Sequence, residues 1–413
     1  MQRFIKKWTQ SSLILKIIIG LIIGAILGIL VPSWKFIGFP GELFVSALKA
    51  IAPILVFVLV SSAISKAGSG IGSRFKTVIV LYLFSTFLSA MVAILASTLF
   101  PVTIHLSGAS TATAPGGLGE VLSNMIMDIF SNPIDLLSNG QYLGILFWSL
   151  VFGLALKMVA TDTTKDVISD LADAVTMIVR GIIQCAPIGI MGLVFNSVSE
   201  SGLEIFTQYG QLILLLVGCI AFVAFVTDPI LSAVATKRNP YPLVLTCLRE
   251  SGITAFFSRS SAANIPVNMH LCERLGLDKD FFSISIPLGA TINMEGAAIT
   301  ITVMTLAVCH TMGINAPLPI TIALCFISTL AACGASGVAG GSLLLIPMAC
   351  SLFGISPDIS MQAVAVGFII GVIQDSCETA LNSAGDALFS ATAEYHDRMK
   401  NGEPVNYLGE FAK

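Results

Sequence analysis

The sequence has 413 residues, of which 55% are hydrophobic and only 11% are charged. Soluble domains carry about 25% charged residues, so this composition excludes an ordinary soluble protein and indicates an all-α polytopic membrane protein. A net charge of −3 without a basic patch gives no reason to expect a nucleic-acid partner.

Six apolar segments in the first 235 residues are candidates for membrane-spanning helices. Basic residues follow the second, fourth and sixth segments, whereas the loops 101–142 and 200–211 contain none. Because basic loops stay in the cytoplasm, this alternation predicts six spans that start from a cytoplasmic N-terminus. The predicted spans are Leu13–Val31, Gly41–Ile64, Val78–Phe100, Gly144–Val159, Val175–Val198 and Leu212–Ala235.

Two later segments begin and end on the same predicted side of the membrane. Pro242–Met269 has basic residues at both ends, and Ile320–Phe353 has them at neither end. Small and polar residues interrupt each segment, at Ser258–Pro266 in the first and at Gly334–Ser342 in the second. Non-helical backbone at membrane depth is tolerated only where it is buried in protein or lines a wet cavity. Paired interruptions of opposite orientation are typical of the binding site of a secondary transporter.

The predicted fold therefore has eight transmembrane helices plus two oppositely oriented re-entrant helical hairpins. The seventh span is Phe281–Val308, between the hairpins. The eighth is Met361–Tyr395, and the basic residues after it return the C-terminus to the cytoplasm.

The eighth span carries a polar stripe. On a helix, five of its side chains fall within about 100° of one another: Asp375, Glu378, Thr379, Asn382 and Asp386. An acid at membrane depth costs about 2.5–3.5 kcal/mol, so three acids on one stripe predict that it faces protein, water or bound cations. The alternative interpretation is a helix end in the membrane interface with solvated carboxylates.

A second polar segment lies in the seventh span, where Thr291, Asn293 and Glu295 alternate with apolar residues. A regular helix would scatter these side chains, and the nearby Gly289 and Gly296 favour a locally unwound backbone that offers carbonyl oxygens. Sodium is a hard cation that takes oxygen ligands. The segment is therefore a candidate cation site, with a purely structural break as the alternative.

Four motifs in order resemble the dicarboxylate/amino acid:cation symporter family, which has the glutamate-transporter fold. They are Tyr82-Leu83-Phe84-Ser85-Thr86, Arg259-Ser260-Ser261, Asn293-Met294-Glu295-Gly296-Ala297, and Asp375, Thr379, Asn382, Gly385 and Asp386 in the last span. The resemblance covers nearly the whole chain. It implies a homotrimer in the lipid of the bacterial cytoplasmic (inner) membrane. Residues 1–71 and 106–208 would form a fixed scaffold domain, and residues 72–105 and 209–413 a moving transport domain.

The resemblance also implies the site residues. Asp375 would hold the α-ammonium of an amino acid, Asn382 its α-carboxylate, and Thr379 its side chain. The full implied substrate set is Arg259, Ser260, Ser261, Val338, Gly341, Asp375, Glu378, Thr379 and Asn382. Three groups of sodium ligands are implied: Gly289, Asn293, Asn382 and Asp386; Thr291 and Met294; and Tyr82, Ser85, Thr86 and Glu295.

Departures from the family motifs modify these expectations. Family members that carry aspartate or glutamate place an Arg where this chain has Glu378. An acid there would repel an acidic substrate, which leaves a small hydroxyl side chain as the expected fit. Whether Glu378 contacts the substrate or only balances Arg259 stays open. Replacement of family residues by Glu295, Ala297 and Ala335 leaves the number of sodium ions open too.

The sequence therefore predicts sodium-coupled symport of serine and threonine into the cell by elevator-type alternating access, and no enzyme activity. Symport of another small neutral amino acid such as alanine is the alternative, followed by symport of an acidic amino acid or dicarboxylate. An intramembrane enzyme would need a base near Ser260, and no His or Lys is close to it in sequence. An anion channel would give flux without accumulation.

Overall fold

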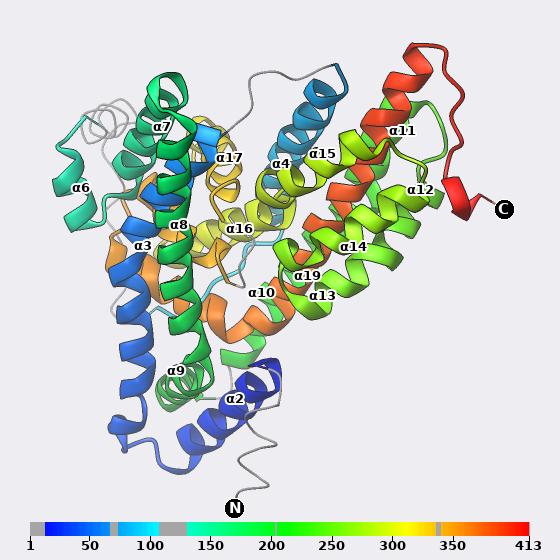
Figure 1. Ribbon diagram of the computed structural model, residues 1–413. Helices are drawn as coiled ribbons and strands as arrows, with labels where there is room; N and C mark the ends of the chain where they lie inside the picture. The colour runs from blue at the N-terminus through cyan, green and yellow to red at the C-terminus, as the bar shows by residue number, and fades with distance from the viewer. Residues whose placement is uncertain (1–12, 67–72, 107–129, 203–204, 336–339, 413) are drawn as a thin grey trace, which may run out of the picture.

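Apolar helices joined by short loops make up almost the whole of the computed structural model, which describes residues 13–66, 73–106, 130–202, 205–335 and 340–412 (Figure 1). No β-strand occurs in these ranges, so the predicted all-α class is confirmed. The helices are α2 (Leu13–Leu30), η1 (Lys35–Ile37), α3 (Phe39–Lys66), α4 (Ser73–Leu99), α6 (Pro133–Asn139), α7 (Tyr142–Val159), α8 (Asp162–Gln184), α9 (Ala186–Ser201), α10 (Ile205–Phe222), η3 (Val223–Thr227), α11 (Asp228–Thr236), α12 (Tyr241–Cys247), η4 (Leu248–Gly252), α13 (Ile253–Ser258), α14 (Ser261–Arg274), α15 (Lys279–Ile292), α16 (Glu295–Met312), α17 (Leu318–Ala332), η5 (Ser342–Leu345), α18 (Ile346–Ser351), α19 (Pro357–Lys400) and η6 (Gly409–Phe411).

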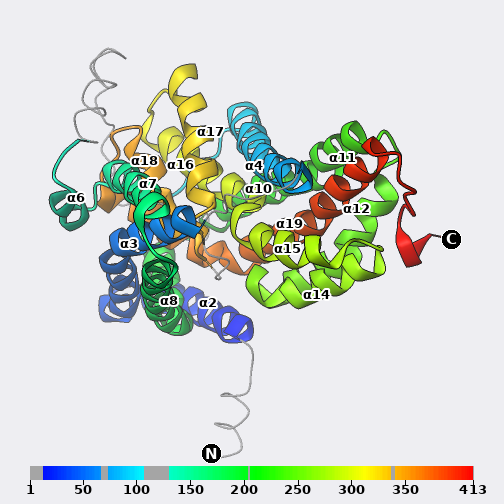
Figure 2. The same cartoon turned by 45° about the horizontal axis from the view of Figure 1, so that its top comes forward.

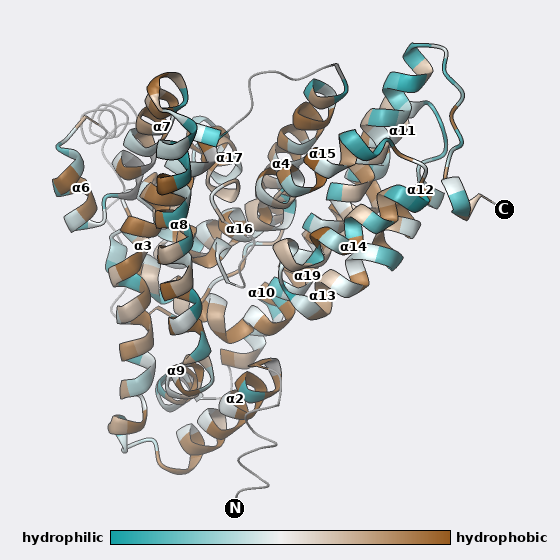
Figure 3. Ribbon diagram, in the orientation of Figure 1, coloured by the Kyte–Doolittle hydropathy of each residue, from teal (hydrophilic) through white to brown (hydrophobic). Residues whose placement is uncertain are grey.

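Several of these helices are suited to a membrane. Five in the described ranges are long and apolar enough to cross one: Lys35–Lys66, Arg74–Leu99, Ile205–Thr236, Lys279–Met312 and Pro357–Lys400. Large apolar side chains are exposed along α2, α4 and α7, and Figure 3 colours much of these helices as hydrophobic. Soluble monomers rarely expose apolar surface of this extent. The chain is therefore a multi-pass membrane protein.

The predicted fifth span, Val175–Val198, is not one straight helix. The chain bends by 57° between α8 and α9, at Cys185. Pro187 lies in the first turn of α9, where its missing N–H costs nothing but where it cannot continue the preceding helix. Composition alone hides this bend, because the apolar run is continuous across it.

The helices pack in two groups that Figures 1 and 2 show side by side. In one group α3 packs against α7, α8 and α9, and α9 against α2. In the other, α19 packs against α4, α10, α13, α14, α15 and α16. The segment α17–α18 touches both groups, since α17 contacts α4 and α18 contacts α7.

Helices α16 and α19 form the centre of the second group. Every residue of α16 from Glu295 to Cys309 is buried, and so is every residue of α19 from Ser383 to Tyr395. A helix buried on all sides has no face left for solvent or lipid. Polar side chains within these two stretches therefore have only protein, or something bound within it, as neighbours.

Candidate functional site

The polar stripe predicted on the last span is buried in α19. The exposed fractions are 2% for Asp375, 6% for Glu378 and for Thr379, 3% for Asn382 and 0% for Asp386. A solvated helix end would expose its carboxylates, so that alternative interpretation is wrong. The stripe faces the protein interior.

The first hairpin segment (residues 241–274, here hairpin 1) turns sharply at its tip. Helix α13 ends at Ser258, and Arg259 takes a left-handed conformation with a φ of 52°. Ser260 is extended, and its hydroxyl caps α14 by accepting the Ala263 N–H at 3.2 Å. A non-Gly residue at positive φ is uncommon, and here it directs the Arg259 side chain toward α19. Ser261, next along the chain, is buried.

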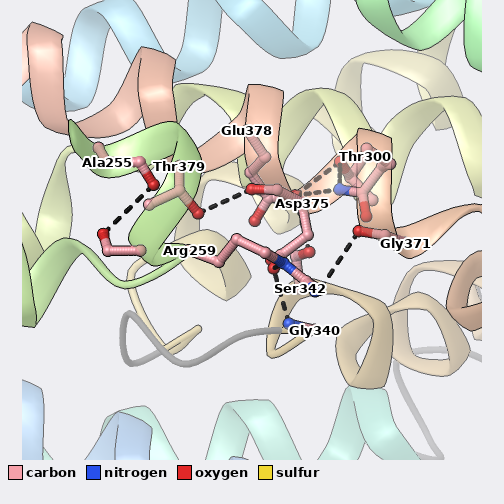
Figure 4. Close-up of polar contacts among 11 residues, drawn as sticks. Ala255, Arg259, Thr300, Gly340, Ser342, Gly371, Asp375, Glu378 and Thr379 are labelled. Atoms are coloured by element: carbon pink, nitrogen blue, oxygen red, sulfur yellow. Dashed lines mark hydrogen bonds and ion pairs between the residues drawn. The ribbon is translucent and has the colours of Figure 1, made fainter. Parts of the chain in front are cut away.

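Asp375 joins three separate segments (Figure 4). Its Oδ2 accepts a hydrogen bond from Arg259 Nε at 2.6 Å, and its Oδ1 accepts one from the Gly340 N–H at 3.1 Å. The Arg259 Nη2 also donates to the carbonyl of Gly371 at 3.3 Å. Thr379 donates its hydroxyl to the Asp375 carbonyl at 2.8 Å. Hairpin 1, α19 and the second hairpin segment (residues 318–351, here hairpin 2) therefore meet at one carboxylate.

Glu378 has different partners. Its Oε2 accepts hydrogen bonds from the hydroxyl of Thr300 at 2.8 Å, from the hydroxyl of Ser342 at 2.9 Å, and from the Gln374 amide (Figure 4). The guanidinium of Arg259 is paired with Asp375 instead, so the interpretation that Glu378 balances Arg259 is wrong for this structure. A carboxylate held by several donors is well stabilised without a cation.

Sequence reasoning missed Thr300, Gln374 and Ser342. Gln374 lies one helical turn before Glu378, a spacing at which side chains meet. Thr300 is a fully buried hydroxyl on α16, as are Thr302 and Thr305 on the same helix. Of these three residues, only Gln374 could have been predicted as a partner of Glu378 from its spacing, since Thr300 and Ser342 belong to segments far from Glu378 in the sequence.

The unwound segment predicted in the seventh span is confirmed. Helix α15 ends at Ile292 and α16 begins at Glu295, and both intervening residues are non-helical, with φ and ψ of −91° and 81° at Asn293 and −121° and 52° at Met294. Asn293 donates through Nδ2 to the Asn382 carbonyl at 3.1 Å and to Asp386 Oδ1 at 3.2 Å. The break thus carries a polar side chain into the middle of α19.

Asn382 is the partner of this break on α19. Its Oδ1 accepts the Gly296 N–H at 2.8 Å, and its Nδ2 lies 3.5 Å from Met294 Sδ. Sulfur is a weak acceptor, so this amide keeps most of its capacity to donate.

The residues implied for a first sodium ion also converge. A Cβ on Gly289 would lie 2.8 Å from Asp386 Oδ1 and 2.8 Å from Tyr82 Oη, so only glycine fits there. The other carboxylate oxygen of Asp386, Oδ2, is buried and has no hydrogen-bond partner in the described part of the chain. Such an orphaned oxygen, beside carbonyl and hydroxyl oxygens, fits the ligand preferences of sodium.

The other residues implied as sodium ligands do not all lie together in the structure. Ser85 and Thr86 are buried and donate to the Tyr82 carbonyl at 3.0 and 2.7 Å. Thr291 is exposed, with its hydroxyl bonded to the Leu288 carbonyl at 2.7 Å, whereas Met294 is buried. The structure does not bring Thr291 and Met294 into one site. Of the implied residues of hairpin 2, Gly341 is buried next to Gly340, and Val338 lies outside the described residues.

Comparison with known proteins agrees with these motifs. The family model described as the sodium:dicarboxylate symporter family matches residues 13–395. The chain is 58% identical over 396 residues to the serine/threonine transporter SstT of Bifidobacterium adolescentis, a match that covers 96% of this chain and 92% of that protein. It is 55% identical to the protein of the same name in Streptococcus agalactiae and 54% identical to that in Streptococcus thermophilus, each match covering 95% of this chain and 98% of the relative. The chain belongs to the sodium:dicarboxylate symporter family.

Proposed function

We propose that this protein couples the inward movement of sodium to the uptake of serine and threonine. The printed names of the full-length relatives support this substrate class. The single structural observation that carries the proposal is the buried Asp375 carboxylate, at which both hairpins meet α19. An amino acid bound there would contact both hairpins at once.

The Asp375 carboxylate exchanges one cation for another in this proposal. Its Oδ2 is held by Arg259 in the structure, and the substrate ammonium takes over that position. A buried carboxylate left without a partner is strongly destabilising, so an exchange of partners is easier than a simple release. Asn382, across the stripe, then donates its amide to the substrate carboxylate.

Selectivity for a small hydroxyl side chain follows from Glu378. A second buried acid near Asp375 disfavours a substrate with an extra carboxylate, because like charges in a desolvated site repel. The donors around Glu378 lie on α16, α19 and hairpin 2. These donors stabilise the Glu378 carboxylate without an Arg. An acidic substrate would need such an Arg as the partner of its own side-chain carboxylate.

Sodium would be held by Asp386 and Asn293 together with backbone carbonyls of the unwound segment. Bound sodium would offset the negative charge of buried carboxylates as the substrate enters. The oxygen-rich surroundings of Asp386 and its orphaned Oδ2 support this assignment.

The proposed architecture is a homotrimer in the bacterial inner membrane with both termini in the cytoplasm, eight spans and two re-entrant hairpins. Residues 1–71 and 106–208 form its scaffold, and residues 72–105 and 209–413 move as the transport domain. The two packing groups of helices support this division, because helices within each group pack more extensively with one another than with the other group.

Uptake into proteoliposomes tests the proposal. Labelled serine should accumulate against its gradient when sodium is outside, and should not accumulate when potassium or a proton gradient replaces sodium. Competition by threonine, alanine and aspartate separates the substrate classes. Flux without accumulation would indicate a channel instead, and equal accumulation in potassium would exclude sodium coupling.

A further inference from the structure

Asp228 is a buried acid that belongs to none of the family motifs. Only 2% of it is exposed, and its Oδ1 has no hydrogen-bond partner in the described part of the chain. It lies where α10 gives way to a wide π turn, Val223–Thr227, before α11 begins. Turns of this kind inside helices often occur at functional sites.

The local sequence explains the irregular turn. Pro229 has no N–H and crowds the carbonyl four residues before it, which is that of Phe225. The hydroxyl of Tyr241 donates to this Phe225 carbonyl at 3.2 Å and so supplies the missing partner. The break is therefore stabilised, and it leaves Asp228 at the start of α11 facing the interior.

Asp228 faces Glu295, the first residue of α16. Glu295 is fully buried, and neither of its carboxylate oxygens has a hydrogen-bond donor among the described residues. The side chains that lie against Glu295 are those of Asp228 and Ser85. Two buried acids thus lie close together, and three of their four carboxylate oxygens have no hydrogen-bond partner in the described part of the chain.

Nearby cationic side chains do not compensate these acids. None of the ion pairs formed by the described residues includes Asp228, Glu295 or Asp386. The nearby donors are also engaged: Ser85 donates to the Tyr82 carbonyl at 3.0 Å, and the Asn293 amide donates to α19. The Ser85 hydroxyl also lies 3.4 Å from Asn293 Oδ1, so hydroxyl and amide oxygens lie close together here, which suits a cation.

There is room beside Asp228. A cavity of about 10 Å³, about the space for one water molecule or one bare cation, lies beside Asp228 and Gly385; its other lining residues are apolar, and Glu295 and Ser85 are not among them. A Cβ on Gly385 would lie 2.8 Å from Glu295 Oε2 and 2.6 Å from Asn293 Nδ2. Glycine at this position lets α19 approach Glu295 closely.

We propose that Asp228 is a sodium ligand of this chain, opposite Glu295 and beside Ser85. The proposal rests on the sodium coupling proposed above and adds a residue to it from outside the family motifs. Among the described residues, no three His, Cys, Asp or Glu side chains converge enough to hold a metal alone. Hydroxyl and carbonyl oxygens complete the set, as sodium allows. At the position of Glu295 the family motif has an Asp. Here the longer Glu295 takes that place, and Asp228 adds a second negative charge beside it.

Sodium binding measured without any amino acid tests this proposal. The full-length protein in lipid nanodiscs is titrated with sodium chloride against choline chloride at constant ionic strength, and the unfolding midpoint is followed. We expect Asp228→Asn to need at least tenfold more sodium than the parent for half of the stabilisation, and Glu295→Gln to behave likewise. Asp170→Asn, the same change at an exposed position of α8, should match the parent.

The outcomes separate this inference from the proposed function. A parent that sodium does not stabilise would refute sodium coupling itself. A stabilised parent with an equally sensitive Asp228→Asn would refute only the role of Asp228, and the two acids would then share a proton. If the Asn variant does not give monodisperse protein, Asp228→Ser is measured by the same criterion, with its midpoint in choline alone as the folding control.

Discussion

Arg259 Nε lies 2.6 Å from Oδ2 of Asp375, so the carboxylate assigned to the substrate ammonium is paired with a cation of the protein itself. The side chains of both residues are nearly buried, at 11% and 3% exposed. Such a pair can be exchanged but is costly to break, because removing one partner leaves an uncompensated charge. In the proposed mechanism the substrate therefore competes with Arg259 for this carboxylate.

Removing this competitor gives the first prediction. Arg259→Ala should lower the stability of the ligand-free protein by about 3–5 kcal/mol, since Asp375 loses its partner. Serine should then bind about tenfold more tightly, because its ammonium no longer displaces a guanidinium. Calorimetric titration in saturating sodium measures this affinity.

The control for Arg259 is Arg249→Ala. Arg249 is on the same hairpin and pairs with Glu250, but 65% of its side chain is exposed, so its loss should leave serine binding unchanged. Loss of serine binding in Arg259→Ala would show that Arg259 contacts the substrate directly, as the family resemblance implies.

Truncating the acid gives the second prediction. Asp375→Ala should abolish serine binding and also destabilise the protein, because the nearly buried Arg259 is left without a counter-charge. The double variant Asp375→Ala/Arg259→Ala should regain most of the lost unfolding midpoint but no serine binding. Recovery of binding in the double variant would place the ammonium site elsewhere.

The bond between Ser342 and Glu378 gives the third prediction. It ties hairpin 2 to α19 at 2.9 Å, and a hydrogen bond to a buried charged group is worth about 1.5–3 kcal/mol. If substrate binds most tightly when hairpin 2 is closed on α19, Ser342→Ala should weaken serine binding by about tenfold or more.

Ser351→Ala is the matched control for Ser342. Its hydroxyl donates to the Met348 carbonyl within the same hairpin. Titration of both variants with serine decides the point: equal affinities would mean that the Ser342 bond does not hold the hairpin closed.

Local features of the site could be predicted from the sequence. The break before Glu295 was predictable because Gly289, Gly296 and three alternating polar residues all lie within one short segment. The turn at Arg259 was predictable for a similar reason, from the small polar residues after it. In each case the physical cause is local, since helix interruption depends on neighbouring residues.

Contacts between distant segments could not be predicted. Asp375 and Glu378 lie on one stripe, so spacing alone could not say which of them pairs with Arg259, 116 residues away from Asp375. The partners of Glu378 on α16 and hairpin 2 depend on packing in three dimensions. The bend at Cys185 was hidden for the opposite reason: hydrophobicity is continuous across it, and only Pro187 marks it.

Gly289 gives the last prediction, which concerns the proposed sodium site at Asp386. A methyl group there would lie 2.8 Å from Asp386 Oδ1 and from Tyr82 Oη. Both groups are fully buried, and each is held by other hydrogen bonds: Asp386 by Asn293, and Tyr82 by the Ser285 carbonyl and the Ser390 hydroxyl. Neither can move aside without losing a partner. Gly289→Ala should therefore displace the carboxylate and raise the sodium concentration needed for half-maximal serine uptake by about tenfold.

The control for Gly289 is Gly210→Ala. A Cβ on Gly210, which lies in α10, would meet nothing within 4 Å, and alanine in a helix is favoured over glycine by about 1 kcal/mol. This variant should keep the sodium dependence of the parent and unfold at the same or a higher temperature. Uptake measured over a range of sodium concentrations compares the two variants directly. An unchanged sodium dependence in Gly289→Ala, with uptake intact, would mean that Asp386 does not bind the coupling ion, since its displacement would then have no effect on sodium.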